Sequence, residues 1–283
     1  MPGTYRFMIV DVFTETPLAG NQLAVFSNAT GMPDELMQRL AAEMGFSETA
    51  FVVPPTGGGD FRMRIFTPTR ELPFAGHPTL GTAFAMAGPL QSVVLRIETG
   101  VGIVPVAMER EGAKVVYGRM QQPIPSVKPF GSATEELFQA LCVTGSTLPV
   151  DEYDNGVRHV FVGLRSFAEV AALRPDVRRI GAVVHDAGVS TFAVEDGRVK
   201  TRMFAADLGV VEDAATGSAA GPLAVHLARH GVIAWGEQIT IAQGAEIGRP
   251  STLYARAEGS GDAITAVDVG GSAVVVARGE FLV

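Results

Sequence analysis

Hydrophobic and polar residues alternate over short segments early in the chain, and one segment among them has a helical period. Two-residue alternation, typical of strands, is found in Arg6 to Phe13, Leu23 to Phe26, Glu48 to Val53 and Phe61 to Phe66. Residues 33–44 instead space their apolar positions as an amphipathic helix does. The pattern predicts four strands and a helix near Pro33 to Met44, and therefore mixed α and β structure.

The next stretch predicts an apolar helix followed by three strands. The helix is expected to begin around Pro78, because proline at the first helical position gives up no hydrogen bond, and to end at Gly88-Pro89. The strands are expected at Val93 to Glu98, Gly102 to Met108 and Lys114 to Met120.

Three prolines within residues 121–129 interrupt the hydrophobic pattern and predict a crossing between domains. We therefore expect an N-terminal domain over residues 1–120 and a C-terminal domain over residues 130–272. The elements predicted after the crossing are a helix near Ala133 to Cys142, strands near Val157 to Val162, Thr191 to Val194 and Lys200 to Phe204, and an apolar helix from Ser218 to His230.

Each half contains a small glycine-bearing turn directly before an apolar helix, AGHPT at residues 75–79 and ATGSA at residues 215–219. Their separation by about half the chain suggests an internal duplication of the architecture. A helix N-terminus presents unpaired N–H groups and the positive end of the helix dipole, so Gly76 and Gly217 can each seat a carboxylate or a phosphate. The alternative is that both glycines only permit tight turns. Neither turn matches a P-loop or a dinucleotide-binding fingerprint.

Composition narrows the functional class. With 22 basic against 30 acidic residues the chain lacks the positive field that nucleic acids require, so no nucleic acid partner is expected. No apolar run approaches the ~18 uncharged residues of a membrane span, and the first residues lack the basic start of an export signal, which predicts a cytoplasmic protein with no membrane partner. The single cysteine, Cys142, excludes an internal disulfide, a cysteine-based metal site and a two-thiol mechanism.

Three residues are candidates for acid/base chemistry. Glu48 lies in a predicted strand, on the same side as Ala50 and Val52, where an acid is costly unless it exchanges a proton; the alternative is an edge-strand glutamate that reaches solvent. His77 either contacts a bound carboxylate or relays a proton, or it is an ordinary turn residue. Asp213 is either a second acid/base or a capping acid for the following helix.

Four further polar residues have weaker functional interpretations. Ser218 is either an N-cap or a donor to a ligand, and Asn21 shapes a turn, with a ligand contact as a secondary role. His226 and His230 share a helix face, as metal ligands do, but the spacing offers no third ligand. We therefore favour a structural role for these two histidines and expect no metal site.

Taken together, these segments resemble the phenazine biosynthesis PhzF-like family nearly from end to end. The matching stretches are Asp11 to Phe13, Gly20 to Phe26, Phe46 to Val52, Arg64 to Pro68, Glu71 to Thr79, Glu212 to Ala219, Gln243-Gly244 and Gly248 to Ser251. One departure is Ala214, which replaces a proline common in the family; it loosens a turn but removes no acid or donor.

The resemblance implies an α+β fold of the diaminopimelate epimerase type. Such a fold has two pseudo-symmetric domains, each a curved mixed β-sheet or barrel around a central α-helix, with the active site in the cleft between them. Its last strand often returns to the first domain, which would place residues 273–283 there. Epimerases of this fold use one thiol in each half, but Ala75 and Thr216 stand at those positions here, so acid/base work would fall to carboxylate and imidazole.

By the same resemblance, Glu48 is the main proton shuttle, and His77 and Asp213 position the substrate and assist the transfer. Ser218 and the amides of Gly76 and Gly217 would hold the polar end of the substrate. The family also implies a homodimer and no cofactor. We expect an isomerase that moves a proton on a small carboxylate-bearing metabolite, such as the cyclic amino acid dihydro-hydroxyanthranilate. The alternatives are an epimerase or racemase of another amino acid and a non-catalytic ligand-binding protein.

Overall fold

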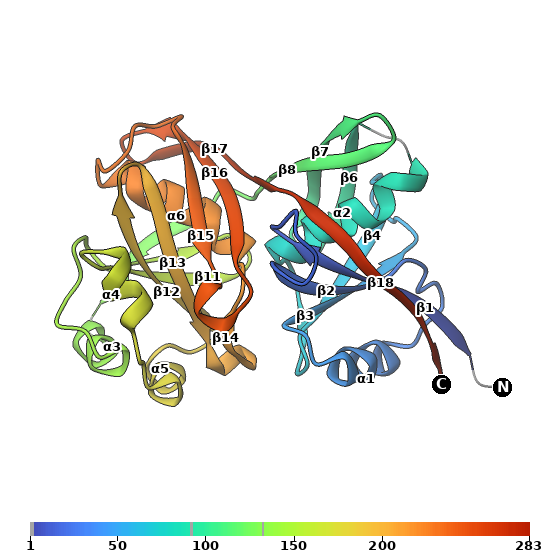
Figure 1. Cartoon of the computed structure of the whole chain (residues 1–283), viewed down its shortest axis with the longest axis horizontal. Helices are drawn as coiled ribbons and strands as arrows, with labels where there is room; N and C mark the ends of the chain where they lie inside the picture. Colours follow the sequence, from blue (N-terminus) through green and yellow to red (C-terminus); the bar gives the residue numbers. More distant parts are fainter. Residues whose placement is uncertain (1–2, 91–92, 132) are drawn as a thin grey trace. The chain divides into compact units, whose positions relative to one another are not determined.

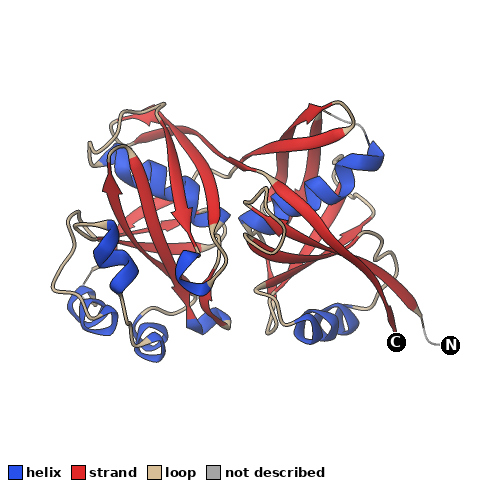
Figure 2. Cartoon of the chain, in the orientation of Figure 1, coloured by secondary structure: helices blue, strands red, loops and turns tan. Residues whose placement is uncertain are grey.

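Contacts between residues divide the chain into two compact units. In the computed structural model, which describes residues 3–90, 93–131 and 133–283, unit 1 comprises Met1–Gln121 with Gly270–Val283, and unit 2 comprises Gln122–Val269. Figure 1 labels the elements and Figure 2 shows that strands predominate. None of the helices in the described residues combines the length and apolar character that a membrane crossing requires.

The elements of unit 1 are β1 (Thr4–Val12), β2 (Asn21–Phe26), α1 (Asp34–Met44), β3 (Glu48–Val53), β4 (Phe61–Phe66), β5 (Glu71–Leu72), α2 (Gly76–Leu90), β6 (Val94–Thr99), β7 (Gly102–Glu111), β8 (Lys114–Gln121) and β18 (Ala273–Leu282). Its strands pair in the order β18–β1–β2–β3–β4–β6–β7–β8. The pairs β2/β3 and β4/β6 are parallel and the others are antiparallel. The short β5 pairs with β4.

The elements that follow are β9 (Ser126–Pro129), α3 (Thr134–Leu141), β10 (Asp151–Asp154), β11 (Arg158–Gly163), α4 (Phe167–Ala172), α5 (Val177–Val183), β12 (Ala187–Glu195), β13 (Arg198–Ala205), the 3-10 turn η1 (Ala206–Leu208), β14 (Val210–Asp213), α6 (Gly217–Arg229), β15 (Gln238–Gln243), the 3-10 turn η2 (Ala245–Ile247), β16 (Ser251–Ser260) and β17 (Ala263–Gly271). Strands β9–β10–β11–β12–β13–β15–β16 repeat the order of unit 1, with parallel pairs at β11/β12 and β13/β15 and the short β14 against β13. The two units therefore share one topology.

A buried helix lies at the centre of each sheet. In unit 1, α2 packs against strands from both ends of the sheet, β18 and β8 included. In unit 2, every residue of α6 from Gly217 to Ala228 is buried. A helix that is apolar on all sides must be enclosed, and a sheet that curves around it supplies the enclosure. The structure confirms the predicted α+β class.

Smaller helices cover the outer faces of both sheets. The helix α1 packs with Phe26, Phe51 and Phe66 in one apolar cluster, and α3, α4 and α5 cover β11 and β12 in another. Central strands are therefore buried on both faces, which favours continuous apolar runs over alternation. In β3 the residues Thr49 and Phe51 are as buried as Ala50, so two-residue alternation was the wrong description of this strand.

Other predicted boundaries also differ from the structure. The helix α2 begins at Gly76, two residues before the expected start at Pro78. Strand β9 lies within the proline-rich segment that was expected to be an irregular crossing, and it pairs with β10. Strands β5, β10 and β14–β17 have no counterpart among the predicted elements. Two of the shortest, β10 and β14, carry sequences with two or more acids, DEYD and VVED, which conceal a strand pattern.

Candidate active site

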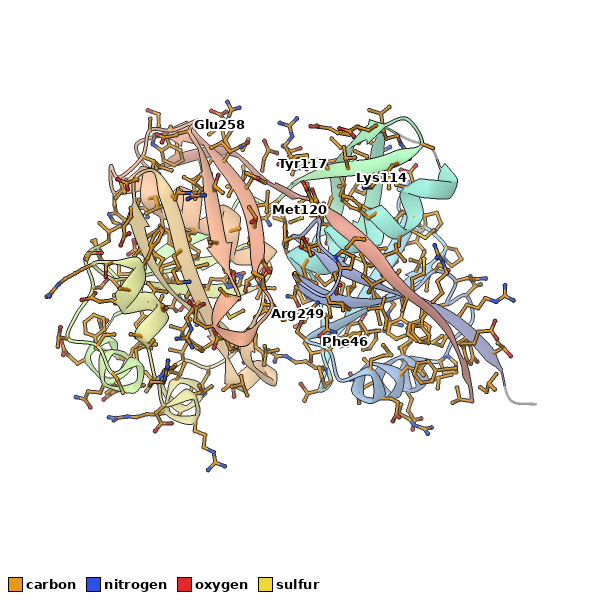
Figure 3. All side chains as sticks on the ribbon, viewed as in Figure 1. Phe46, Lys114, Tyr117, Met120, Arg249 and Glu258 are labelled. Carbon is orange, nitrogen blue, oxygen red and sulfur yellow. The ribbon has the colours of Figure 1, made fainter. Side chains whose placement is uncertain are left out.

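In unit 1 the candidate acid and imidazole lie side by side. Glu48 opens β3 and His77 is the second residue of α2; their Oε2 and Nε2 atoms are 3.6 Å apart. The side chain of Glu48 is 14% exposed and that of His77 only 3%. The Glu48 side chain is thus largely buried but retains some access to solvent. Phe46, labelled in Figure 3, and Ser47 precede it and are also half-buried.

Asn21 orients His77 from the other side. The Nδ2 atom of Asn21 lies 3.2 Å from Nδ1 of His77, and the hydroxyl of Ser47 donates to Oδ1 of Asn21 at 3.3 Å. With Oδ1 accepting from Ser47, the amide of Asn21 presents N–H to His77, so Nδ1 must accept. In this arrangement the proton of a neutral His77 ring is on Nε2, the nitrogen that lies 3.6 Å from Oε2 of Glu48. Ser47 joins the site through this network, a role that the sequence interpretation did not assign.

The beginning of α2 places Gly76 beside this group. Pro78 costs α2 no hydrogen bond, because it lies in the first turn, where a backbone N–H would have no helical acceptor. The Thr79 hydroxyl donates to the carbonyl of Ala75 at 2.7 Å and ties the turn to the helix. The amide of Gly76 belongs to the first turn, where no helical carbonyl can accept it, and it is a suitable donor for an anion.

In unit 2 the corresponding turn holds Asp213. Its Oδ2 accepts from the hydroxyl of Thr216 at 2.7 Å, while Nε2 of Gln243 donates to the backbone carbonyl of Asp213 at 2.9 Å. The Thr216 amide donates back to Oε1 of Gln243 at 3.1 Å. The N-cap of α6 is Thr216, whose own side chain makes no capping hydrogen bond. Asp213 stabilises this turn through the Thr216 hydroxyl.

An ion pair anchors the strand that ends at Asp213. Arg202 contacts both carboxylate oxygens of Glu212, with Nε to Oε1 and Nη2 to Oε2 each at 2.8 Å. Both side chains are nearly enclosed, at 7% and 10% exposed. The hydrogen bond to the Glu212 carboxylate raises the pKa of Arg202, so the guanidinium stays charged at physiological pH. A bidentate contact of this kind restrains direction as well as distance, and it places the neighbouring Asp213.

Ser218 is the second residue of α6 and is not an N-cap, which removes one of its two predicted roles. Its Oγ lies 3.1 Å from Nε2 of His159. Burial lowers the pKa of His159 to about 3, so the ring is neutral and orients the hydroxyl without adding charge. His159 was missed from the sequence, because a single histidine within an apolar strand gives no signal of its partner.

Asn155 and Gln122 complete the surroundings of the α6 N-terminus. Pro222 lacks the N–H that would bond the carbonyl of Ser218 four residues earlier. The side chain of Asn155 replaces it, with Nδ2 donating to that carbonyl at 2.9 Å. Gln122 donates in the same way to the carbonyl of Gly217 at 2.7 Å. The N-terminus of α6 is therefore held by side-chain amides from outside the helix.

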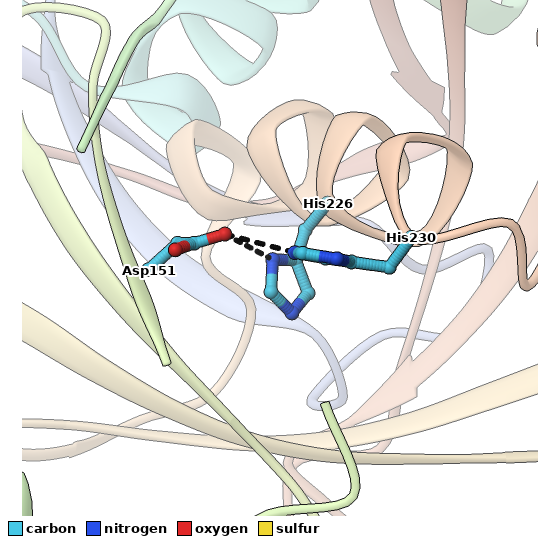
Figure 4. A group of neighbouring side chains, drawn as sticks. All are labelled: Asp151, His226 and His230. Atoms are coloured by element: carbon cyan, nitrogen blue, oxygen red, sulfur yellow. Dashed lines mark hydrogen bonds and ion pairs between the residues drawn. The ribbon is translucent and has the colours of Figure 1, made fainter. Parts of the chain in front are cut away.

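His226 and His230 meet a carboxylate that their spacing could not reveal. Asp151 on β10 lies 2.8 Å from Nε2 of His230 and 3.7 Å from Nδ1 of His226, measured from its Oδ2 (Figure 4). Asp151 is therefore close to both histidines in space, although the sequence spacing offered no third ligand.

Sequence and structure comparisons agree on the family. The sequence model of the phenazine biosynthesis-like proteins matches residues 10–279. This chain belongs to that family. It is similar to the trans-2,3-dihydro-3-hydroxyanthranilate isomerase of Pseudomonas aeruginosa, with 52% identity over 97% of this chain and 98% of the relative. The Pseudomonas chlororaphis protein of the same name is 49% identical over 98% of this chain and 99% of its own length.

Solved structures show the same relationship. A phenazine biosynthesis protein of the PhzF family from Bacillus anthracis superposes with a TM-score of 0.86 at 26% identity, over 99% of this chain and 100% of that one. A probable proline racemase from Agrobacterium radiobacter, at 12% identity and a TM-score of 0.75 over 99% of this chain and 93% of its own, shares the fold. The chain is thus an isomerase of the PhzF type, as predicted from the sequence.

Proposed function

We propose that this isomerase moves a proton between two carbons of a small cyclic amino acid, with Glu48 as the group that carries the proton. The substrate class is that of trans-2,3-dihydro-3-hydroxyanthranilate, after which the relatives above are named. The observation that carries the proposal is the placement of the Glu48 carboxylate 3.6 Å from a buried, oriented imidazole.

In the first step, the Glu48 carboxylate removes a proton from a carbon of the substrate that a conjugated system makes acidic. Glu48 becomes a carboxylic acid and the substrate an anion delocalised over that system. In the second step, the same carboxyl group returns the proton to another carbon, so the double bond shifts and nothing is gained or lost. A positioned acid/base of this kind contributes ~10²–10⁴-fold to the rate.

The surrounding groups suit this chemistry. The Nε2–H of His77 faces the Glu48 carboxylate and can stabilise it when it is charged, and Asn21 keeps the imidazole in that tautomer. The Gly76 amide at the N-terminus of α2 favours a negative charge on the substrate, because the helix dipole is positive there. From unit 2, Ser218 and the Gly217 amide are proposed to bind the substrate carboxylate and Asp213 to assist the transfer.

Proton NMR in deuterated buffer tests the proposal. The wild-type chain is expected to convert trans-2,3-dihydro-3-hydroxyanthranilate, and deuterium enters the receiving carbon wherever the Glu48 carboxyl exchanges its proton with the solvent before returning it. Glu48→Gln keeps the size of the side chain but cannot take a proton, and it is expected to lose at least ~10²-fold in rate. The matched control is Glu43→Gln, at an exposed position of α1, which should keep full activity.

Three outcomes would contradict parts of the proposal. Deuterium exchange that persists in Glu48→Gln would show that another residue is the base. Deuterium at a carbon whose configuration inverts, with no shift of a double bond, would indicate an epimerase or racemase. Binding of the compound without conversion or deuterium exchange would indicate a non-catalytic ligand-binding protein.

A further inference from the structure

The C-terminal end of α6 carries a cluster of polar side chains that the proposed proton transfer does not use. His226 and His230 are four residues apart and share one face of the helix. Asp151 and Tyr153 are two residues apart on β10 and share one face of that strand. Figure 4 shows Asp151 directed at both imidazoles. A helix and a strand thus present two pairs of potential ligands to each other.

One atom from each of Asp151, His226 and His230 lies close enough to the others to contact a single ion. The Oδ2 atom of Asp151 lies 2.8 Å from Nε2 of His230 and 3.7 Å from Nδ1 of His226, and all three ligand atoms fall within 4.8 Å of one another. Ligands that bind zinc at ~2.0–2.1 Å in tetrahedral geometry are about 3.4 Å apart. The two contacts of Asp151 lie on either side of that value, and the remaining distance, between the two histidine nitrogens, is at most 4.8 Å. The Tyr153 hydroxyl lies 3.1 Å from Nδ1 of His226 and places a further oxygen beside the proposed ligands.

From this arrangement we propose that Asp151, His226 and His230 bind one divalent transition-metal ion of the zinc class. Two imidazoles and one carboxylate are ligands that zinc prefers, and three protein ligands leave a position for water. The ion would join the last turn of α6 to β10. The site is independent of the proposed proton transfer.

Burial and charge support this assignment. The side chain of His226 is fully enclosed, with its ring against Phe161 and Phe192, while that of His230 is 21% exposed and leaves a route from solvent. The C-terminal end of a helix also favours a cation.

Arg229 brings a positive charge close to the proposed site. Its Nη1 lies 3.7 Å from Oδ2 of Asp151 and 3.3 Å from the Tyr153 hydroxyl. Its Nη2, however, bonds Asp262 at 2.8 Å, which offsets its charge on the other side. Without a metal, hydrogen bonds and ion pairs hold these side chains together as a cluster of Asp151, Tyr153, His226, Arg229 and His230. The experiment below distinguishes that cluster from a metal site.

The test is titration of the full chain, after treatment with a chelator, with Zn²⁺ alone in a calorimeter and with Co²⁺ alone in a spectrophotometer. Wild type is expected to bind one equivalent of each, with the visible absorption bands of four-coordinate cobalt. Asp151→Asn and His230→Ala should each weaken binding at least ~10–100-fold. Because His230 is at the rim and Asn matches Asp in size, both variants should fold. The control is His185→Ala, an exposed histidine, which should bind as wild type does.

The proposal is overturned if wild type takes up neither ion stoichiometrically, which would leave the hydrogen-bonded cluster alone. It is also overturned if both variants bind as tightly as wild type, since the ion would then lie elsewhere. Isomerase activity is not the readout, so this result is separate from that of the Glu48→Gln experiment.

Discussion

Two glycines of α2 predict opposite effects of the same substitution. Gly81 faces the sheet: a Cβ atom there would lie 2.6 Å from Cγ2 of Val12 and 2.7 Å from Cδ2 of Leu23. Gly88, on the same helix, has no atom of the described residues within 4 Å of the corresponding position. Alanine is a better helix former than glycine by ~1 kcal/mol at both sites. Only Gly81→Ala must also displace packed side chains.

The cost at Gly81 follows from the immobility of its neighbours. Val12 and Leu23 are fully buried on adjacent strands, so neither can move into solvent. Each contact would have to lengthen by about 1 Å, which is overpacking of the kind that costs ~1–3 kcal/mol. Because the gain in helix propensity is common to both variants, the difference between Gly81→Ala and Gly88→Ala isolates this cost. Gly81→Ala should be less stable than Gly88→Ala by ~1–3 kcal/mol.

Urea unfolding followed by circular dichroism measures this difference. Gly88→Ala should unfold at the wild-type urea concentration or above it, and Gly81→Ala below Gly88→Ala. In thermal unfolding the gap corresponds to ~2–4 °C for each kcal/mol in a protein of this size class. Equal stability of the two variants would contradict this prediction, because it would mean that Val12 and Leu23 accommodate the added methyl group without cost.

Two further predictions concern individual polar groups. The carboxylate of Glu98 accepts from the amides of Thr56, Gly59 and Gly57, which lower its pKa to about 2 from an ordinary value near 4.5. Because the pKa of Glu98 is lower in the folded state, its carboxylate contributes fully to stability above pH 4.5, and this contribution is lost as the pH falls toward 2. The urea midpoints of wild type and Glu98→Gln should therefore converge over that range. Parallel curves would contradict this prediction. Asn155→Ala should destabilise the chain by ~1–3 kcal/mol, because the buried carbonyl of Ser218 loses its donor. Adding Pro222→Ala, which restores a helical N–H to that carbonyl, should recover part of the loss in a double-mutant cycle; strictly additive effects would show that the two donors are unrelated.

The sequence predicts the parts of this structure that depend on local patterns. The two glycine turns and the apolar helices after them are visible because a helix that is buried on all sides leaves a long run of small and apolar residues. The position of Glu48 at the start of a strand was also predicted, and the structure adds its contact with His77. The family resemblance and the isomerase class are confirmed by the comparisons.

What the sequence could not predict depends on contacts between distant residues. Asn155 supports Ser218 only because Pro222 leaves a carbonyl without its donor, and this need is apparent only when the helix is built. Asp151 reaches His230 across 79 positions of sequence, so ligand spacing along one helix could not identify it. Strand β9 was missed because its flanking prolines resemble a linker, although edge positions of a sheet tolerate proline.

The pairing of β18 with β1 has a consequence for biosynthesis. One edge of β1 pairs with the neighbouring β2, but the other edge finds its partner only at Leu282 to Ala273. The backbones of Gly3 and Val283 exchange hydrogen bonds beyond this pair. A ribosome therefore releases all of Gln122–Val269 before it delivers the last strand of the unit that it began first. Unit 2 can fold on the emerging chain while β1 waits with an open edge. The adjacent ends also suit circular permutation: a short linker from Val283 to Gly3, with new termini at residues 121 and 122, would make both units continuous in sequence.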